Sequence, residues 1–144
     1  MMFGDKILKY KDELLADLNT LIGFESVANE KPEECQNAIN FMLKRANDFG
    51  LTGEQVTDES MHIQLGSKGK LCGILSHLDV VPAGNNWSVL PYSLTEKDGR
   101  LFGRGIADDK GAALVTLYCL RALKEEGIFK KYFVVSRDNI SRTT

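Results

Sequence analysis

Apolar residues recur at helical spacing in three segments of the chain. Residues 5–24 carry apolar side chains three, four and seven positions apart, which predicts one amphipathic helix. Residues 32–49 repeat this pattern, with Pro32 suited to the first helical position and Gly50 suited to the stop. Residues 111–126 form the third predicted helix. We expect the first two helices to lie on a sheet.

Other apolar runs predict three strands. Residues 61–65 alternate between apolar and polar side chains, which is typical of a strand with one buried face. Residues 71–75 and 132–135 are apolar almost throughout, as in strands that are covered on both faces. Residues 79–105 form a long excursion, with a predicted hairpin turn at Asp98-Gly99.

The order of strand, excursion, helix and strand predicts a right-handed β-α-β unit. The predicted fold class is therefore α/β, with a mostly parallel sheet and helices on both of its faces. In such sheets, ligands bind beyond the carboxyl ends of the strands. We expect one domain over residues 1–135 and a disordered tail over residues 136–144, which have no apolar periodicity.

Composition narrows the range of functions. The 144 residues include 18 basic and 20 acidic side chains, and a net charge of −2 argues against a nucleic-acid partner. The hydrophobic fraction of 43% is typical of a soluble globular chain, and the longest apolar run, near residues 111–120, is too short for a membrane helix. Cys35, Cys72 and Cys119 each lie in an apolar stretch, which predicts buried thiols in a cytoplasmic protein.

Two short segments carry side chains suited to metal chemistry. His77 ends a predicted buried strand, and the carboxylate of Asp79 can accept the proton of one imidazole nitrogen. The simpler interpretation is a core histidine followed by a turn aspartate. His62 lies on the polar side of its strand and is predicted to be solvated. The second segment, residues 103–111 (GRGIADDKG), places two carboxylates just before a helix, between glycines that allow tight bends.

The second segment also fits other interpretations. Asp109 could simply cap the following helix. A phosphate-binding loop requires a different order, because Lys110 precedes Gly111 and no Ser or Thr follows. A dinucleotide fingerprint would need a glycine where the chain has Asp108. These patterns disfavour a phosphate- or nucleotide-binding module.

The two segments are more specific in combination. His77 ends one strand and Asp108 opens the helix that returns to the next strand, so we expect both to face the same crevice. A carboxylate has two oxygens and can bridge two divalent cations about 3.5–4 Å apart. Such a pair of ions lowers the pKa of a shared water and clamps a carbonyl oxygen. This combination predicts amide hydrolysis near neutral pH.

Residues 77–82 (HLDVVP), followed by residues 103–111, closely resemble the motifs of the co-catalytic di-zinc metallopeptidases. That family includes bacterial dipeptidases, succinyl-diaminopimelate desuccinylase, aminoacylase and carboxypeptidase G. Trp87 and residues 98–102 look most like the dipeptidase branch. The resemblance runs over residues 6–135 and implies the N-terminal part of a zinc-peptidase catalytic domain that acts on short peptides.

The resemblance also implies roles for individual side chains. His77 would ligate one zinc ion, Asp108 would bridge both ions, and Asp79, as the predicted catalytic residue, would orient His77. Mn²⁺ or Co²⁺ could replace Zn²⁺, because the ligand chemistry of these ions overlaps. In this family the peptide bond that corresponds to Asp108–Asp109 is typically cis.

The chain departs from the family pattern after its last predicted strand. The family carries an acidic stretch there, commonly Asp-Glu-Glu, whose first Glu is the general base and whose second Glu is a zinc ligand. No glutamate follows Glu126 in this chain. If Asp138 aligns with the family's Asp, then Asn139 replaces the base and Ile140 replaces the ligand. The later family ligands and the lid domain would lie beyond Thr144.

We therefore expect a truncated copy of a longer enzyme that is inactive as this chain alone. A catalytic zinc ion normally has about three protein ligands plus water, and the chain offers His77 and Asp108 for two ions. The alternative is a non-catalytic remnant that only binds zinc or oligomerises through an uncovered sheet edge. The expected partners are a short peptide in the intact family and a second copy of the chain, without nucleic acid or membrane.

Overall fold

The computed structural model describes residues 3–67, 72–127 and 132–137. In chain order, its elements are α1 (Phe3–Ile7), the 3-10 helix η1 (Leu8–Tyr10), α2 (Lys11–Gly23), α3 (Pro32–Asp48), β1 (Thr52–Thr57), β2 (Ser60–Leu65), β3 (Gly73–Ser76), β4 (Thr95–Lys97), β5 (Arg100–Phe102), α4 (Lys110–Glu125) and β6 (Tyr132–Arg137). The second and third predicted helices are confirmed, each to within a residue or so at its ends.

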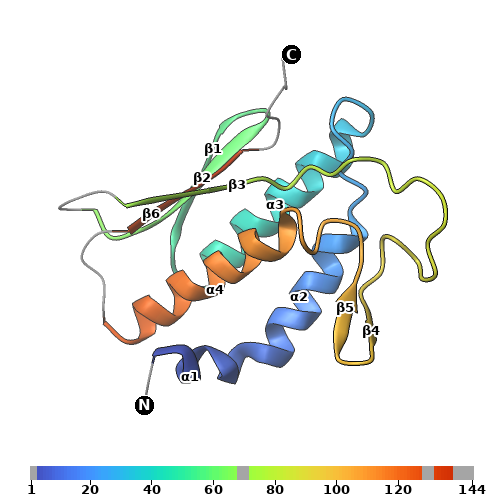
Figure 1. The fold of residues 1–144 in the computed structure, drawn as a ribbon. Helices are drawn as coiled ribbons and strands as arrows, with labels where there is room; N and C mark the ends of the chain where they lie inside the picture. Colours follow the sequence, from blue (N-terminus) through green and yellow to red (C-terminus); the bar gives the residue numbers. More distant parts are fainter. Residues whose placement is uncertain (1–2, 68–71, 128–131, 138–144) are drawn as a thin grey trace.

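The main sheet has the strand order β1-β2-β6-β3 (Figure 1). β1 and β6 both run antiparallel to β2, whereas β6 and β3 run parallel to each other. The prediction of a mostly parallel sheet is therefore wrong. The expected parallel pair is present, but the hairpin β1–β2 extends the sheet with antiparallel strands. Residues 52–57 contain Val56 as their single large apolar side chain, so no alternating pattern marked β1.

The helices of the described residues cover one face of this sheet, so the prediction of helices on both faces is also wrong. α3 and α4 contact the strands, and α2 packs on α4, with all three on the same side (Figure 1). Met61, Ile63 and Leu65 of β2 are buried in the core that forms beneath these helices. On the edge strand β3, by contrast, Ile74 is 47% exposed and Leu75 is 64% exposed.

A second, two-stranded sheet consists of β4 and β5, which pair antiparallel. Asp98 and Gly99 connect them, and both have positive φ angles, of 54° and 69°. This backbone matches the twist of a tight hairpin, which confirms the predicted turn.

The first predicted helix is interrupted. η1 separates α1 from α2, and Leu8, which belonged to the predicted apolar stripe, is 68% exposed. Leu18, Leu21 and Ile22 of α2 are buried, so the stripe is correct in that part. No helix of the described ranges is long and apolar enough to cross a membrane.

The three cysteines are free thiols, but the prediction that they are buried is wrong. Cys35 and Cys119 are half-buried on α3 and α4, and Cys72 is exposed. Cys72 lies just before β3, which is an edge strand of the main sheet.

The predicted tail begins inside a strand. The backbone of Ser136 and Arg137 belongs to β6, where it pairs with β2. Residues 138–144 lie outside the described residues, as does Leu71 of the predicted strand.

Candidate metal site

The chain after β3 is tied to the segment that follows α2. The Val80 backbone N–H donates to the Ser26 carbonyl at 2.8 Å, and the Ser26 hydroxyl donates to the Leu78 carbonyl at 2.7 Å. Leu78 and Val80 are buried, whereas His77 and Asp79 alternate with them and stay half-buried. The extended backbone therefore keeps both polar side chains accessible.

Two glycines shape the turn that leads into α4. Gly105 has a φ angle of +97°, a conformation that side chains other than glycine rarely adopt. A Cβ on Gly111 would lie 2.1 Å from the Ile106 carbonyl oxygen, so the first turn of α4 packs this closely only with glycine. The turn holds Asp108 just before the helix, and the peptide bond between Asp108 and Asp109 is cis, as the resemblance implied.

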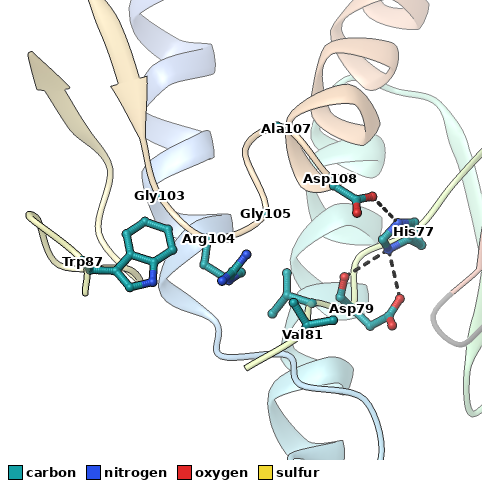
Figure 2. Close-up of a pocket in the computed structure, with 10 residues that line it drawn as sticks. His77, Asp79, Val81, Trp87, Gly103, Arg104, Gly105, Ala107 and Asp108 are labelled. Atoms are coloured by element: carbon teal, nitrogen blue, oxygen red, sulfur yellow. Dashed lines mark hydrogen bonds and ion pairs between the residues drawn. The ribbon is translucent and has the colours of Figure 1, made fainter. Parts of the chain in front are cut away.

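These two segments meet at the His77 ring (Figure 2). Nε2 of His77 lies 2.9 Å from Oδ1 of Asp108. Nδ1 lies 3.1 Å from Oδ1 of Asp79 and 3.0 Å from its backbone carbonyl oxygen. The expectation that His77 and Asp108 face the same crevice is confirmed, and Asp79 contacts the opposite nitrogen of the ring.

Asp109 also connects the segment of His77 to the start of α4. It occupies the N-cap position of α4, but its side chain makes no capping hydrogen bond. Its carboxylate instead accepts from the backbone N–H of His77 at 3.3 Å. This contact joins the segment after β3 to the start of α4, so Asp109 does more than precede a helix.

The neighbouring carboxylates change the acidity of the histidine. Burial alone would lower the pKa of His77, because it disfavours the charged imidazolium. Hydrogen bonding to Asp108 and Asp79 outweighs burial, and the pKa of His77 lies above its usual 6.5. The side chain of Asp108 is 84% exposed and that of His77 is 27% exposed, so a ligand can reach both.

The atoms that face each other here, an imidazole nitrogen and a carboxylate oxygen, are of the types that bind zinc, but a zinc ion normally has more protein ligands than these two. Imidazole nitrogen and carboxylate oxygen are both common zinc ligands, and the contact with Asp79 fixes the ring so that Nε2 faces Asp108. Within residues 3–67, 72–127 and 132–137, no group of three or more His, Cys, Asp or Glu could hold a metal ion. The structure thus brings together two candidate ligands and one orienting carboxylate.

The other histidine lies elsewhere. His62 is paired across the β1–β2 hairpin with Glu54, and its Nε2 is 3.9 Å from that carboxylate. Its side chain is 19% exposed, so the prediction that it is solvated is only partly right. It does not line the cavity beside His77.

A cavity of about 610 Å³ opens beside the histidine and its carboxylates. His77 and Asp108 lie on one side of it, and Trp87 and Arg104 lie on the other (Figure 2). No sequence pattern assigned a role to Trp87 or Arg104, because their place in the wall depends on how the long excursion folds back. A cavity of this size is typical of small-molecule sites.

Lys110 is a further residue that sequence reasoning missed. Its side chain is fully buried, and Nζ donates to the carbonyl oxygens of Leu21 at 2.9 Å and Phe24 at 2.6 Å. These carbonyls lie at the end of α2, where unpaired backbone oxygens carry partial negative charge. Lys110 therefore anchors the start of α4, and with it Asp108, to the end of α2.

Comparison with known proteins finds similarity to peptidases. Residues 73–135 match the model of Peptidase family M20/M25/M40. A protein of Staphylococcus saprophyticus named "Putative dipeptidase" is 32% identical over 135 residues, which cover 88% of this chain and 29% of that protein. A protein of Staphylococcus aureus with the same description is 30% identical with the same coverage. The chain thus spans about 29% of the length of these relatives.

Solved structures share the fold. Human carnosine dipeptidase 1 superposes with a TM-score of 0.80 at 22% identity, covering 95% of this chain and 34% of that one. The di-peptidase Dug1p of Saccharomyces cerevisiae gives a TM-score of 0.83 at 18% identity, covering 98% of this chain and 34% of that one. The α/β arrangement described above therefore corresponds to about a third of each of these larger proteins.

Proposed function

We propose that the chain, whose residues 73–135 match peptidase family M20/M25/M40, carries the N-terminal, metal-binding part of a metal-dependent hydrolase of short peptides. The observation that supports this most strongly is the meeting of His77 Nε2 with the Asp108 carboxylate at the edge of an open cavity. The dipeptidase-like relatives support a short peptide as the substrate.

Each polar residue of the site has a distinct task in this proposal. His77 and Asp108 bind zinc, for which His77 must be neutral and present the lone pair of Nε2. Asp79 accepts the proton on Nδ1, which fixes the required tautomer and the orientation of the ring. A bound zinc ion supplies a water of lowered pKa and polarises a peptide carbonyl.

Zinc titration by calorimetry tests this assignment. The unchanged chain is expected to bind zinc weakly, because the site offers two ligands where a stable site normally has at least three. His77→Ala and Asp108→Ala are each expected to abolish the binding. His62→Ala and Cys72→Ser serve as controls, since they remove the other histidine and the exposed thiol, and they should leave the affinity unchanged. Undiminished binding by His77→Ala would contradict the proposal.

The same titration should depend on pH in a defined direction. Protons compete with zinc for Nε2, so the affinity falls as the pH decreases through the pKa of His77. Because hydrogen bonding to Asp108 and Asp79 raises this pKa, the decline should begin above pH 6.5, the usual histidine value. An affinity that stays constant from neutral to mildly acidic pH would remove His77 from the site.

A further inference from the structure

Arg104 is a half-buried cation in the cavity wall, and it has no carboxylate partner within the described part of the chain. One of its terminal nitrogens donates to the Ala83 carbonyl at 3.0 Å, and its guanidinium carbon lies 5.1 Å from the centre of the Trp87 ring. Its Nε is buried and has no hydrogen-bond partner among the residues that the structure describes. A guanidinium group has five N–H donors, so most of its donor capacity is unused by the fold.

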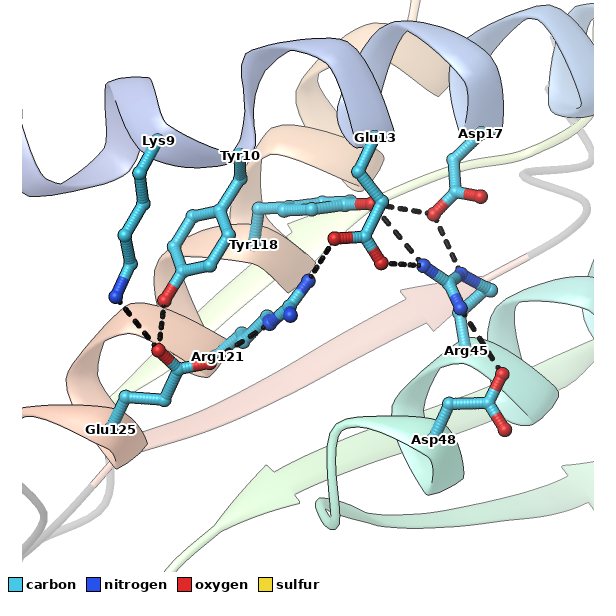
Figure 3. A network of polar contacts seen from close by, with 9 residues as sticks. All are labelled: Lys9, Tyr10, Glu13, Asp17, Arg45, Asp48, Tyr118, Arg121 and Glu125. Atoms are coloured by element: carbon cyan, nitrogen blue, oxygen red, sulfur yellow. Dashed lines mark hydrogen bonds and ion pairs between the residues drawn. The ribbon is translucent and has the colours of Figure 1, made fainter.

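Two other half-buried arginines, Arg45 and Arg121, differ from Arg104 because they form ion pairs with carboxylates (Figure 3). The side chains of Arg45 and Arg121 are 16% and 21% exposed, and each forms ion pairs with at least two carboxylates. Both lie among the helices, where their charge is compensated within the chain. Arg104, in contrast, faces an open cavity without such compensation. The carboxylates that pair with the first two arginines are Glu13, Asp17, Asp48 and Glu125.

We propose that Arg104 binds the carboxylate group of a short peptide in this cavity. The planar guanidinium matches a carboxylate in geometry and charge, and such a contact would satisfy the buried Nε. The substrate class rests on the function proposed above, but the anion-binding role rests on Arg104 itself. The residue determines substrate orientation and takes no part in the chemical step.

The charges around the cavity set that orientation. Asp79 and Asp108 repel an anion on the His77 side, whereas Arg104 attracts one on the Trp87 side (Figure 2). A peptide would therefore place its carboxylate against Arg104. The rest of the peptide, including its amide group, would extend toward His77 and Asp108.

Trp87 provides a built-in reporter of this contact. It is the single tryptophan of the chain, and its indole N–H donates to the Ala83 carbonyl that Arg104 also contacts. An anion bound to Arg104 lies beside the indole ring. The fluorescence of Trp87 and the NMR signal of its indole N–H should therefore both change when the site fills.

The test titrates the metal-free, full 144-residue chain with glycylglycine and, separately, with glycylglycine amide. Glycylglycine should shift the Trp87 signals, whereas the amide, which lacks the carboxylate, should not. Arg104→Gln should weaken the binding of glycylglycine at least about tenfold, as expected for the loss of charged hydrogen bonds. Arg104→Lys keeps the positive charge but loses the planar guanidinium group with its paired N–H donors, so this variant should bind glycylglycine with intermediate affinity.

Two controls separate this inference from the proposed metal site. Arg100→Gln removes an exposed arginine of β5 and should bind glycylglycine like the unchanged chain. Arg104→Gln should keep its zinc affinity, which also shows that the variant is folded. Equal responses to the peptide and its amide, no response to either, or undiminished binding by Arg104→Gln would overturn the role of Arg104, whatever the zinc titration shows.

Discussion

Supplied with zinc, the 144-residue chain is expected to hydrolyse dipeptides no faster than a zinc-free control. Only two candidate ligands, His77 and Asp108, converge within the described residues, and a catalytic zinc ion normally has about three. No glutamate follows Glu126 in the sequence, so the base that the resemblance requires is missing as well. Loss of a general base alone typically slows such a reaction by about 10²–10⁴-fold.

The measurement is the release of free amino acids from a dipeptide by the purified chain, with zinc and with a chelator. The yeast di-peptidase Dug1p serves as the positive control under the same conditions. Hydrolysis by this chain that disappears with the chelator and in Asp108→Ala would contradict the prediction. It would also mean that a residue outside the proposed set supplies the base.

Lys110→Met should lower the free energy of unfolding by about 3 kcal/mol. Methionine fills the space of the aliphatic stem but removes the ammonium group that donates to the Leu21 and Phe24 carbonyls. Both contacts are charge-assisted, the one with Leu21 is buried and the one with Phe24 is partly buried, and their loss leaves two carbonyl oxygens without this donor. Urea denaturation of the variant and the unchanged chain gives the difference directly.

Lys124→Met is the matched control for this substitution. Lys124 also donates to carbonyls at the end of a helix, those of Phe49 and Gly50 after α3, but its side chain is only half-buried. Because water can replace the lost donor there, we expect a loss below about 1 kcal/mol. An equal decrease in the free energy of unfolding in the two variants would contradict the claim that burial makes the Lys110 contacts the more stabilising ones.

The sequence predicted those elements whose patterns are local. Helix α3 follows an apolar stripe that begins at Pro32, and the turn at Asp98-Gly99 follows from residues that tolerate positive φ. Strand β1 escaped prediction because its side chains are mostly polar and its place in the sheet comes from pairing with β2. The antiparallel character of the sheet therefore could not be predicted from the β-α-β pattern alone.

In the candidate site, too, local sequence patterns were predictive and long-range contacts were not. His77 and Asp108 stand out because His77 directly follows an apolar strand and Asp108 lies just before a helix, next to a glycine-rich turn. Arg104 and Lys110 lie in the motif of residues 103–111, but their roles were not predicted, because both contact backbone carbonyls far away in the sequence. Contacts with such distant backbone groups leave no periodic or spacing signal, so these two roles became visible only in the fold.

The most direct test of the account is to locate the metal ion. Crystals of the chain soaked in zinc would be measured by anomalous diffraction at the zinc absorption edge. We predict a peak about 2.0–2.2 Å from Nε2 of His77 and from a carboxylate oxygen of Asp108, with Asp79 still bound to Nδ1. Zinc bound instead at His62 or Cys72, with His77 and Asp108 still in direct contact, would contradict it.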